Sequence, residues 1–437
     1  MTAAAFTHYD AVIVGGGISG LTAAWRLRDR RILVLEAADI VGGRLKTVWR
    51  DPYWLNLGAH VLMQGGPMAT LAGELGVPLV EPPGDFLAVA MHNRVVRANS
   101  LPGMFFRLPL SIAARASLAL TGARLLLGRR QNPKRLEAIS LADFLGPMHP
   151  DVEALMRVVA NRLTGELTDL SALVGVNGFA HLWLGSRLNI DGGSVRLPLA
   201  LQAALGGQVV TGARVTGVSQ TAGEVTVAYQ HGGAAHIVTA NTCVMAVPAP
   251  LARDLVADLP AEADEALARM RYTPFLVAGI FTNESGSMPW DNLYALATPE
   301  KSFCMLFNPG NALRRDATRR PGGSLVVYAV ADRAAELMAL DDDVVRARYL
   351  DDLYSIFPEA RGAVAEVVIQ RWRHGTAMGY RGRAAAVERL DAGVGRIVFA
   401  GDYMMPVEGV DATESGTIAA ASVLRRSSAS SRPSRAR

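Results

Sequence analysis

Cysteine is nearly absent from this chain of 437 residues, which contains only Cys243 and Cys304. Two thiols cannot form a disulfide framework, and no group of cysteine and histidine residues has the spacing of metal ligands. We therefore expect no metal site and a reducing, cytoplasmic environment. The first ten residues also lack the basic and apolar segments of a secretory signal, which favours the same location.

Charged residues are scarce too, at 19% of the chain, whereas apolar residues make up 50%. This balance excludes a wholly disordered chain and a coiled coil. The length exceeds what one ordinary hydrophobic core organises, so we expect at least two domains.

Long uncharged runs are missing as well. Arg107, Arg115 and Arg124 interrupt the most apolar region before it reaches the roughly 20 residues that a membrane span needs. At about 100° per residue Arg115 and Arg124 lie on opposite sides of one helix, so no clean amphipathic face is expected. A membrane-spanning helix is thus not expected, and peripheral contact with a membrane stays open.

The surplus of basic residues comes from one end of the chain. Five arginines lie in residues 425–437, and without them 39 basic residues face 40 acidic ones. The body of the protein is therefore close to neutral, which gives no reason to expect a nucleic-acid partner. The Ser, Arg and Pro content of residues 425–437 predicts a disordered tail.

The N-terminal segment has the pattern of a βαβ unit. A buried strand is predicted at Tyr9–Val14, a helix at Ser19–Arg30, and a second strand at Arg31–Leu35, directly before Glu36. Between the first strand and the helix lies the glycine-rich stretch 15–20.

Three further regions follow this unit. Residues 95–185 are predicted to be mostly helical, with residues 118–127 and 136–159 the clearest stretches. Short strands are expected at 209–218, 225–229, 235–239 and 243–247, and a late buried strand at 396–400. The chain therefore returns to its first domain more than once, so the domains are interleaved.

The glycine stretch carries the first chemical signal. In Gly15-x-Gly17-x-x-Gly20, the first glycine allows a tight turn, the second lets a pyrophosphate approach the backbone, and the third lets the helix pack on the strand. Ser19 lies in the first helical turn, whose free N–H groups favour a phosphate. Glu36 suits the ribose hydroxyls of adenosine and would repel a 2′-phosphate, which disfavours an NADP-type ligand.

The segment after Glu36 indicates that the ligand is FAD rather than NAD. Gly42, Gly43 and Arg44 offer a second close backbone approach and a cation beside the pyrophosphate. Here the sequence resembles the flavin-containing amine oxidase superfamily, which includes amine, polyamine and L-amino acid oxidases, protoporphyrinogen oxidase and carotenoid desaturases. The resemblance implies an FAD enzyme.

Further matches to this superfamily extend along the chain. The resemblance implies that Leu57–His60 passes along the isoalloxazine ring, that Val215 meets adenine through its backbone, and that the acid of a closing motif holds a ribityl hydroxyl. It also implies that the helix beginning at Ala412 points its N-terminus at the flavin pyrimidine. The cofactor-binding residues implied after Arg44 are Gly58, Ala59, His60, Val215, Gly401, Asp402, Asp411, Ala412 and Thr413.

The resemblance also implies a fold. We expect an α/β flavoprotein of two domains: a three-layer, Rossmann-like FAD domain and an interleaved α+β substrate domain. The FAD domain is assigned to residues 1–95, 190–260 and 385–424. The substrate domain is assigned to residues 96–189 and 261–384.

Several positions depart from the superfamily pattern, and each departure excludes or disfavours a property of its members. No cysteine lies near the closing motif, so FAD is expected to be non-covalent. No lysine lies in Pro274–Phe281, where many of these oxidases hold a water at the reactive flavin nitrogen. The aromatic pair that encloses amines is not evident, and Met63 and Gln64 stand where polyamine oxidases present an acid, which disfavours a plain polyamine oxidase.

The candidate catalytic residues are His60, Gln64, Tyr380 and Glu408, with Tyr403 an alternative to Tyr380. We expect an FAD-dependent oxidase that removes hydride from a carbon next to nitrogen, in an amine or amide of secondary metabolism. Two alternatives stay open: a carbon–carbon desaturase of porphyrinogen or carotenoid type, and a redox-neutral flavin isomerase. The expected partners are a small-molecule substrate and dioxygen or another electron acceptor, and a homodimer is the default oligomer.

Overall fold

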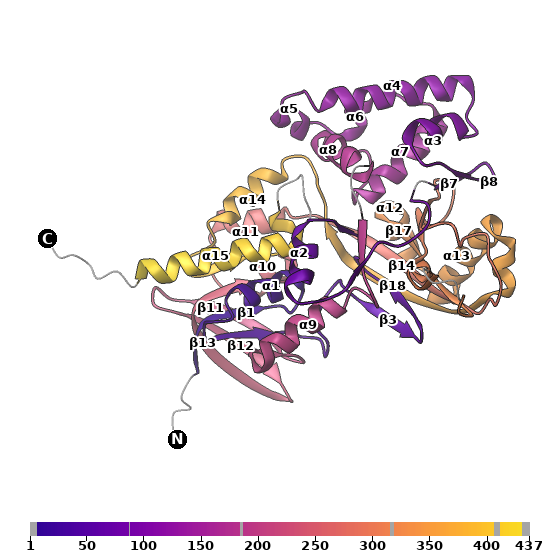
Figure 1. Ribbon diagram of the computed structural model, residues 1–437. Coiled ribbons are helices and arrows are strands. Elements are labelled where there is room, and N and C mark those ends of the chain that lie inside the picture. Colours follow the sequence, from indigo (N-terminus) through magenta and orange to yellow (C-terminus); the bar gives the residue numbers. More distant parts are fainter. Residues whose placement is uncertain (1–6, 87, 184–186, 315–318, 406–410, 431–437) are drawn as a thin grey trace.

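The computed structural model describes residues 7–86, 88–183, 187–314, 319–405 and 411–430. Within these ranges the chain forms two large sheets, each with its own helices, and a separate group of helices (Figure 1). The predicted two-domain α/β architecture is confirmed.

The first sheet has the strand order β10–β2–β1–β13–β12–β11, and β19 pairs with the end of β13. Strands β10, β2, β1, β13 and β19 are parallel, whereas β11 and β12 are antiparallel. Parallel strands are covered on both faces, which explains their nearly continuous apolar sequences. The bounds are β1 His8–Val14, β2 Ile32–Leu35, β10 Val209–Val210, β11 Arg214–Gln220, β12 Val225–His231, β13 Ala234–Met245 and β19 Ile397–Phe399.

Helices cover both faces of this sheet. Along β1, Ala11 and Ile13 face one core, whereas Val12 and Val14 face the other. The first core is closed by α1 (Ile18–Arg26), α2 (Pro67–Glu74), α9 (Arg196–Leu205) and α15 (Ala412–Ser430). The second is closed by α10 (Ala249–Leu255), α11 (Ala261–Ala268) and α14 (Arg383–Asp391). The result is the three-layer domain that the sequence predicted.

The second sheet has the order β18–β14–β17–β16–β15–β7–β8. Helices α12 (Ala331–Met338) and α13 (Asp342–Ile356) cover one face, and β4 (Tyr53–Asn56) packs on the other. The strand bounds are β7 Ala88–Met91, β8 Arg94–Arg97, β14 Tyr272–Thr282, β15 Ala295–Ala297, β16 Met305–Phe307, β17 Gly323–Val330 and β18 Val364–Ala377.

Smaller elements connect these layers. Strand β3 (Thr47–Arg50) pairs with β4, and β9 (Arg187–Ile190) pairs with both β5 (Leu62–Met63) and β6 (Leu79–Val80). Short 3-10 helices, η1 to η4, lie at Gly206–Gln208, Pro309–Arg314, Pro358–Gly362 and Asp402–Met404.

The helical group lies beyond the second sheet, away from both chain ends (Figure 1). The helix predicted for 136–159 is broken into three. Ile139 is extended before Ser140 caps the next helix, and Gly146 has a positive φ of 65° before Pro150 starts the third. The bounds are α3 Leu101–Arg107, α4 Ile112–Gly128, α5 Pro133–Ala138, α6 Leu141–Leu145, α7 Pro150–Arg162 and α8 Ala172–Trp183.

The predicted domain boundaries shift at three places. β7 and β8, expected in the first domain, pair into the second sheet. Helix α11, expected in the second domain, packs in the core of the first. Residues 425–430, expected to belong to a disordered tail, instead continue α15, and Arg426 donates there to the carbonyl groups of Ala392 and Gly395. Residues 431–437 lie outside the described residues.

Helices α3 and α4 expose an apolar surface, which we call the α4 surface. Phe106 is 74% exposed and Ile112 is 89% exposed; Leu120, Leu126 and Leu127 belong to the same surface. The sequence analysis expected no such face because of Arg115 and Arg124. Both arginines instead turn their guanidinium groups onto backbone carbonyls of neighbouring segments, which leaves the apolar side chains exposed.

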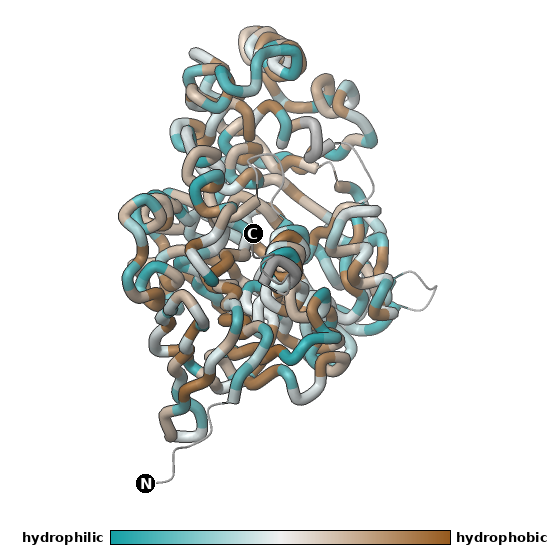
Figure 2. The backbone as a smooth tube through the Cα atoms, turned by 90° about the vertical axis from the view of Figure 1, so that its left-hand side faces the viewer, coloured by the Kyte–Doolittle hydropathy of each residue, from teal (hydrophilic) through white to brown (hydrophobic). Residues whose placement is uncertain are grey.

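Figure 2 shows polar and apolar positions alternating along the helices of this group. Among the residues that the structure describes, no helix is both long and apolar enough to cross a bilayer.

Candidate functional site

The glycine-rich loop joins β1 to α1 as predicted. Gly15 has a φ of +107°, and a Cβ there would lie 2.8 Å from the Ala246 carbonyl oxygen. Gly20 packs against the loop so closely that a Cβ would lie 2.0 Å from the Gly15 oxygen. A Cβ on Gly17, by contrast, would meet nothing within 4 Å. Gly17 is also the N-cap of α1 and offers no side chain to its N–H groups, so the helix end is open to a phosphate.

Glu36 lies beside this loop and is held in place by it. Its carboxylate accepts hydrogen bonds from the N–H groups of Gly16 (2.6 Å) and Ala38 (2.8 Å). The second glycine pair adjoins the first loop, because the Gly42 N–H donates to the Gly16 carbonyl at 2.9 Å. Val215 lies in β11. The residue just before this strand, Ala213, donates its N–H to the Glu36 carbonyl at 2.8 Å, which places the start of β11 beside Glu36. The predicted adenosine and pyrophosphate residues thus come together.

The N-termini of α1 and α15 converge. A Cβ on Gly416 would lie 2.2 Å from the Ser19 carbonyl oxygen, so the two helices touch at their first turns. Asp411 caps α15 by accepting from the Thr413 N–H at 2.9 Å. This negative charge offsets part of the positive helix end that the sequence analysis assigned to the flavin. The Thr413 hydroxyl is buried and has no partner among the described residues.

Arg44 and Asp402 join the two domains. The guanidinium donates to both carboxylate oxygens of Asp402, at 2.6 and 2.9 Å, and to the Gly375 carbonyl at 3.1 Å. Asp402 also accepts from the Ala377 N–H at the end of β18, at 2.8 Å. Burial raises the pKa of Asp402, but the charge and hydrogen bonds of Arg44 outweigh burial and hold it below its ordinary value. The cation expected beside the pyrophosphate is thus already paired with a carboxylate.

The segment Leu57–His60 runs past Arg44. A Cβ on Gly58 would lie 1.8 Å from the Arg44 carbonyl oxygen, and the Ala59 N–H donates to that oxygen at 3.1 Å. His60 Nδ1 lies 3.1 Å from the Gly58 carbonyl, and its Nε2 is buried without a partner among the described residues. Burial lowers the pKa of His60, so the neutral ring is favoured. Ala59 itself is exposed.

The open space at Gly17 and the unpartnered polar atoms of Thr413 and His60 fit a bound dinucleotide. Glycine loops and helix N-termini surround a site of FAD type, and the arrangement leaves hydrogen-bonding groups that this structure does not otherwise satisfy. The individual contacts assigned to these residues stay predictions.

An aromatic cluster begins at His60. Its ring meets Phe307 edge-on, with centroids 4.8 Å apart, and Phe307 stacks on Tyr328 (5.9 Å) and meets Tyr294 edge-on (5.5 Å). Tyr294 in turn stacks on Phe86 at 5.7 Å. We call these five rings the ring cluster. Sequence analysis missed all of them except His60, since single aromatic residues in strands usually mark a core.

Two arginines end the ring cluster. The guanidinium carbons of Arg187 and Arg162 lie 3.9 and 5.0 Å from the centroid of the Phe86 ring. Arg162 is the last residue of α7, and Arg187 begins β9. No local pattern marks either residue, because each meets the Phe86 ring only in the folded chain.

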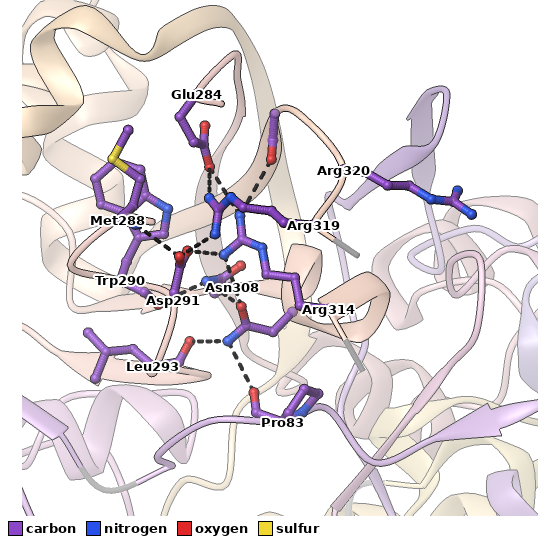
Figure 3. A network of polar contacts seen from close by, with 12 residues as sticks. Pro83, Glu284, Met288, Trp290, Asp291, Leu293, Asn308, Arg314, Arg319 and Arg320 are labelled. Atoms are coloured by element: carbon purple, nitrogen blue, oxygen red, sulfur yellow. Dashed lines mark hydrogen bonds and ion pairs between the residues drawn. The ribbon is translucent and has the colours of Figure 1, made fainter. Parts of the chain in front are cut away.

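A buried polar network holds the ring cluster in place (Figure 3). Asn308 follows Phe307 and donates to the Trp290 carbonyl at 3.0 Å. Asn311 donates to the carbonyls of Pro83 (3.1 Å) and Leu293 (2.8 Å), which precede Phe86 and Tyr294.

Two ion-paired arginines complete this network. Arg314 and Arg319 each contact both Glu284 and Asp291, so two positive and two negative charges balance. Taking these charges out of water is costly, and their mutual pairing offsets that cost. The network thus fixes loops behind the site and is not itself a reaction centre.

The predicted catalytic residues do not form one group. Gln64 is exposed just after β5, on the same segment as His60. Tyr380 packs against the helical core, and its hydroxyl is buried without a partner among the described residues. Tyr403 is fully buried, so it lines no open site. Glu408 lies outside the described residues.

All lysine and cysteine residues of the chain lie within the described residues, so their surroundings can be stated. Lys301 forms an ion pair with Asp352 (3.7 Å), and its side chain is 18% exposed. Lys46 donates to Gln370 at 2.6 Å, and Lys134 is exposed at the start of α5. The two cysteines are buried, and burial raises the pKa of each thiol to about 12.

A separate cavity of about 650 Å³ lies between the helical group and α12. Its lining is mostly polar and carries both signs of charge, and it contains none of the predicted FAD-binding residues. Its members include Glu153, Arg157, Glu166, Asp332, Arg333 and Glu336.

A three-layer domain with a glycine loop at the end of β1, joined to a second sheet domain, has the architecture of a flavoprotein. Residues 18–424 match the family of flavin containing amine oxidoreductases. The chain belongs to this family.

Individual relatives differ in how much they share with this chain. Polyamine oxidase 2 of Arabidopsis thaliana is 37% identical over 89 residues, which cover 19% of this chain and only 18% of that protein. L-amino acid oxidase of Cerastes cerastes is 26% identical over 463 residues, covering 95% of this chain and 87% of that protein. A solved putrescine oxidase, bound to putrescine, is 21% identical with a TM-score of 0.76, covering 96% of this chain and 99% of that one.

Proposed function

We propose that this protein oxidises an amine at the carbon next to nitrogen and yields an imine. The observation that carries the proposal is the position of the ring cluster, which begins at His60 on the segment assigned to the flavin ring. Membership of the amine oxidoreductase family and the similarity to an L-amino acid oxidase over most of both chains support it. A role in secondary metabolism is part of the proposal, since the acid expected of a polyamine oxidase is replaced by Met63 and Gln64.

FAD, when bound, supplies the hydride acceptor. The chain's own residues would hold the cofactor and orient the substrate. Glu36, fixed by two backbone N–H groups, would accept hydrogen bonds from the ribose hydroxyls, and the open N-terminus of α1 would bind the pyrophosphate. His60, which Phe307 meets edge-on, would lie between the cofactor and the substrate.

Anaerobic mixing of the FAD-loaded protein with a panel of candidate substrates tests the proposal. We expect one or more amines to bleach the visible absorbance of the flavin, with an aldehyde or keto product after the imine hydrolyses. Besides amines, the candidate substrates include an amide, a porphyrinogen and a polyene. Bleaching by a porphyrinogen or polyene alone would support the desaturase instead, and product without any bleaching would support the isomerase.

A further inference from the structure

Two side chains from distant segments hold the two ends of Leu57–His60. The Trp372 indole N–H, on β18, donates to the Leu57 carbonyl at 2.6 Å. At the other end the Asn189 amide, on β9, donates to the His60 carbonyl at 2.9 Å in the orientation that satisfies its neighbours. Trp372 is half-buried and Asn189 is buried, so water competes little for either hydrogen bond. We call Trp372 and Asn189 the clamp residues.

The Asn189 side chain uses both ends of its amide. Its nitrogen faces the carbonyls of His60 and Leu188 (3.1 Å), which can only accept, and its oxygen accepts from the Tyr294 hydroxyl at 3.0 Å. Burial raises the pKa of Tyr294, so this hydroxyl keeps the proton that it donates. An apolar residue would neither donate nor accept here, and a carboxylate would only accept. An amide therefore meets both requirements of this position.

The segment between the clamp residues adjoins the glycine-rich loop. Its Ala59 N–H donates to the Arg44 carbonyl at 3.1 Å, and a Cβ on Gly43, next to Arg44, would lie 3.4 Å from the Gly17 Cα. Ala59 itself is exposed. These contacts place an open stretch of the segment beside the helix end that is free to bind a phosphate.

We propose that Trp372 and Asn189 are positioning residues for the cofactor, because they hold the backbone of Leu57–His60 in the conformation that receives the flavin. A segment fixed at both ends has few other conformations to leave when FAD binds, and a preformed site binds more tightly than one that must first be ordered. Each clamp residue acts through a backbone carbonyl and needs no contact of its own with FAD. The proposal rests on the position of this segment in the FAD site and not on the reaction, so failed amine oxidation would leave it standing.

FAD affinity tests the clamp residues without any substrate. We expect Asn189→Leu and Trp372→Phe each to weaken FAD binding by about 2- to 10-fold, which corresponds to one neutral hydrogen bond. Titration of the full-length, FAD-free protein, followed by quenching of flavin fluorescence, measures the dissociation constant. An unchanged constant in both variants would overturn the proposal and would leave amine oxidation, which flavin bleaching tests, unaffected.

Matched variants separate positioning from a general loss of stability. Asn161→Leu removes a buried amide that donates to the Gly165 carbonyl (3.1 Å), and Trp49→Phe removes an indole N–H that donates to the Gly192 carbonyl (2.7 Å). Neither hydrogen bond involves Leu57–His60, so we expect both variants to keep the FAD dissociation constant of the wild type. An equal weakening of FAD binding in these controls would overturn the proposal.

Asn189→Asp keeps the size of the side chain, so it serves if Asn189→Leu proves unstable. An ionised carboxylate cannot donate to the His60 carbonyl, whereas the protonated acid can. We therefore expect Asn189→Asp to bind FAD more weakly than wild type at about pH 8 and to regain affinity relative to wild type by about pH 5, because burial raises the pKa of the introduced carboxyl group. A merely structural defect has no reason to recover on acidification, so weak binding at both pH values would overturn the role of Asn189.

Discussion

Asp402 is the residue on which three distant segments meet. Its carboxylate receives both guanidinium hydrogen bonds of Arg44 and the backbone N–H of Ala377, and its own carbonyl accepts from Arg383 at 2.7 Å. One buried side chain thus ties the first domain to the end of β18. Sequence analysis identified Arg44 and Asp402 as site residues but did not foresee that they pair with each other.

Removing this carboxylate should therefore destabilise the protein. We expect Asp402→Asn to lower the free energy of unfolding by about 1.5 to 3 kcal/mol, the value of a hydrogen bond to a charged group, because Arg44 is only half-buried and water can hydrate part of its charge. Denaturant unfolding of the FAD-free protein measures this loss. Asp264→Asn breaks an exposed pair with Arg253 and should leave the free energy of unfolding nearly unchanged. Equal costs for the two variants would contradict this account.

The pH dependence of this pair has a definite sign. Because the folded-state pKa of Asp402 is lowered, its stabilisation is complete above the ordinary aspartate pKa and is lost as the pH falls through the lowered value. The difference in stability between wild type and Asp402→Asn should shrink on acidification.

The two thiols give a prediction about cofactor attachment. Cys243 lies in β13 and Cys304 just before β16, both fully buried. With thiol pKa values of about 12, neither supplies thiolate at neutral pH. We expect acid precipitation to release all the flavin into the supernatant. A coloured pellet that contains stoichiometric flavin would show covalent attachment.

At the scale of elements, the strongest local patterns were predictable. The unit β1–α1–β2 has the expected order because the continuous apolar strands, the glycines and Glu36 all favour one structure. Tertiary pairing was not predictable: the two strands expected at 235–239 and 243–247 are one strand, β13. Its first half pairs with β12 and its last residues with β19, so partners on both sides override the polar break between them.

Strand β14 bears on the electron acceptor. This strand contains no lysine. A Cβ on Gly279, in its middle, would lie 2.7 Å from the Leu55 side chain and 2.8 Å from the Leu57 side chain. The strand therefore packs directly behind the segment predicted to contact the flavin. Lys301 pairs with Asp352 of α13, on the covered face of the second sheet. We expect dioxygen to reoxidise the reduced enzyme slowly and a quinone to reoxidise it faster.

Stopped-flow mixing of the reduced enzyme with aerated buffer measures this rate. Lys301→Met is the control and should leave the rate unchanged. Reoxidation as fast as in a lysine-bearing relative, or strong slowing in Lys301→Met, would refute the idea.

For the whole molecule, the α4 surface predicts an interaction with anionic membranes. Residues 98–136 contain seven basic residues and no acidic one, and they carry the exposed side chains of Phe106 and Ile112. Apolar insertion and attraction to anionic lipid would act together there. We expect the protein to sediment with vesicles that contain phosphatidylserine and less with neutral phosphatidylcholine vesicles.

Variants make the vesicle experiment specific. Ile112→Ser combined with Leu126→Ser should reduce sedimentation, whereas Leu251→Ser, an exposed leucine on α10, should not. Binding that is equal for both lipids, or unchanged in the double variant, would count against this surface.

The whole site could be predicted only in part. Its FAD half is encoded in short motifs whose glycines and acids have fixed spacing, and the structure brings these motifs together. The ring cluster beside His60 is assembled from residues that the sequence keeps far apart, such as Phe86, Tyr294 and Tyr328. No local pattern marks such residues, because they meet only when the strands of the second sheet and the segment before β7 come together.

The most direct test of the central claim is single-turnover flavin reduction with an amine deuterated at the carbon next to nitrogen. This account predicts that the flavin is bleached anaerobically and that deuteration slows the bleaching by a primary isotope effect, because the bond to that hydrogen breaks as the flavin accepts hydride. Bleaching by a porphyrinogen or polyene while every amine leaves the flavin oxidised would contradict it.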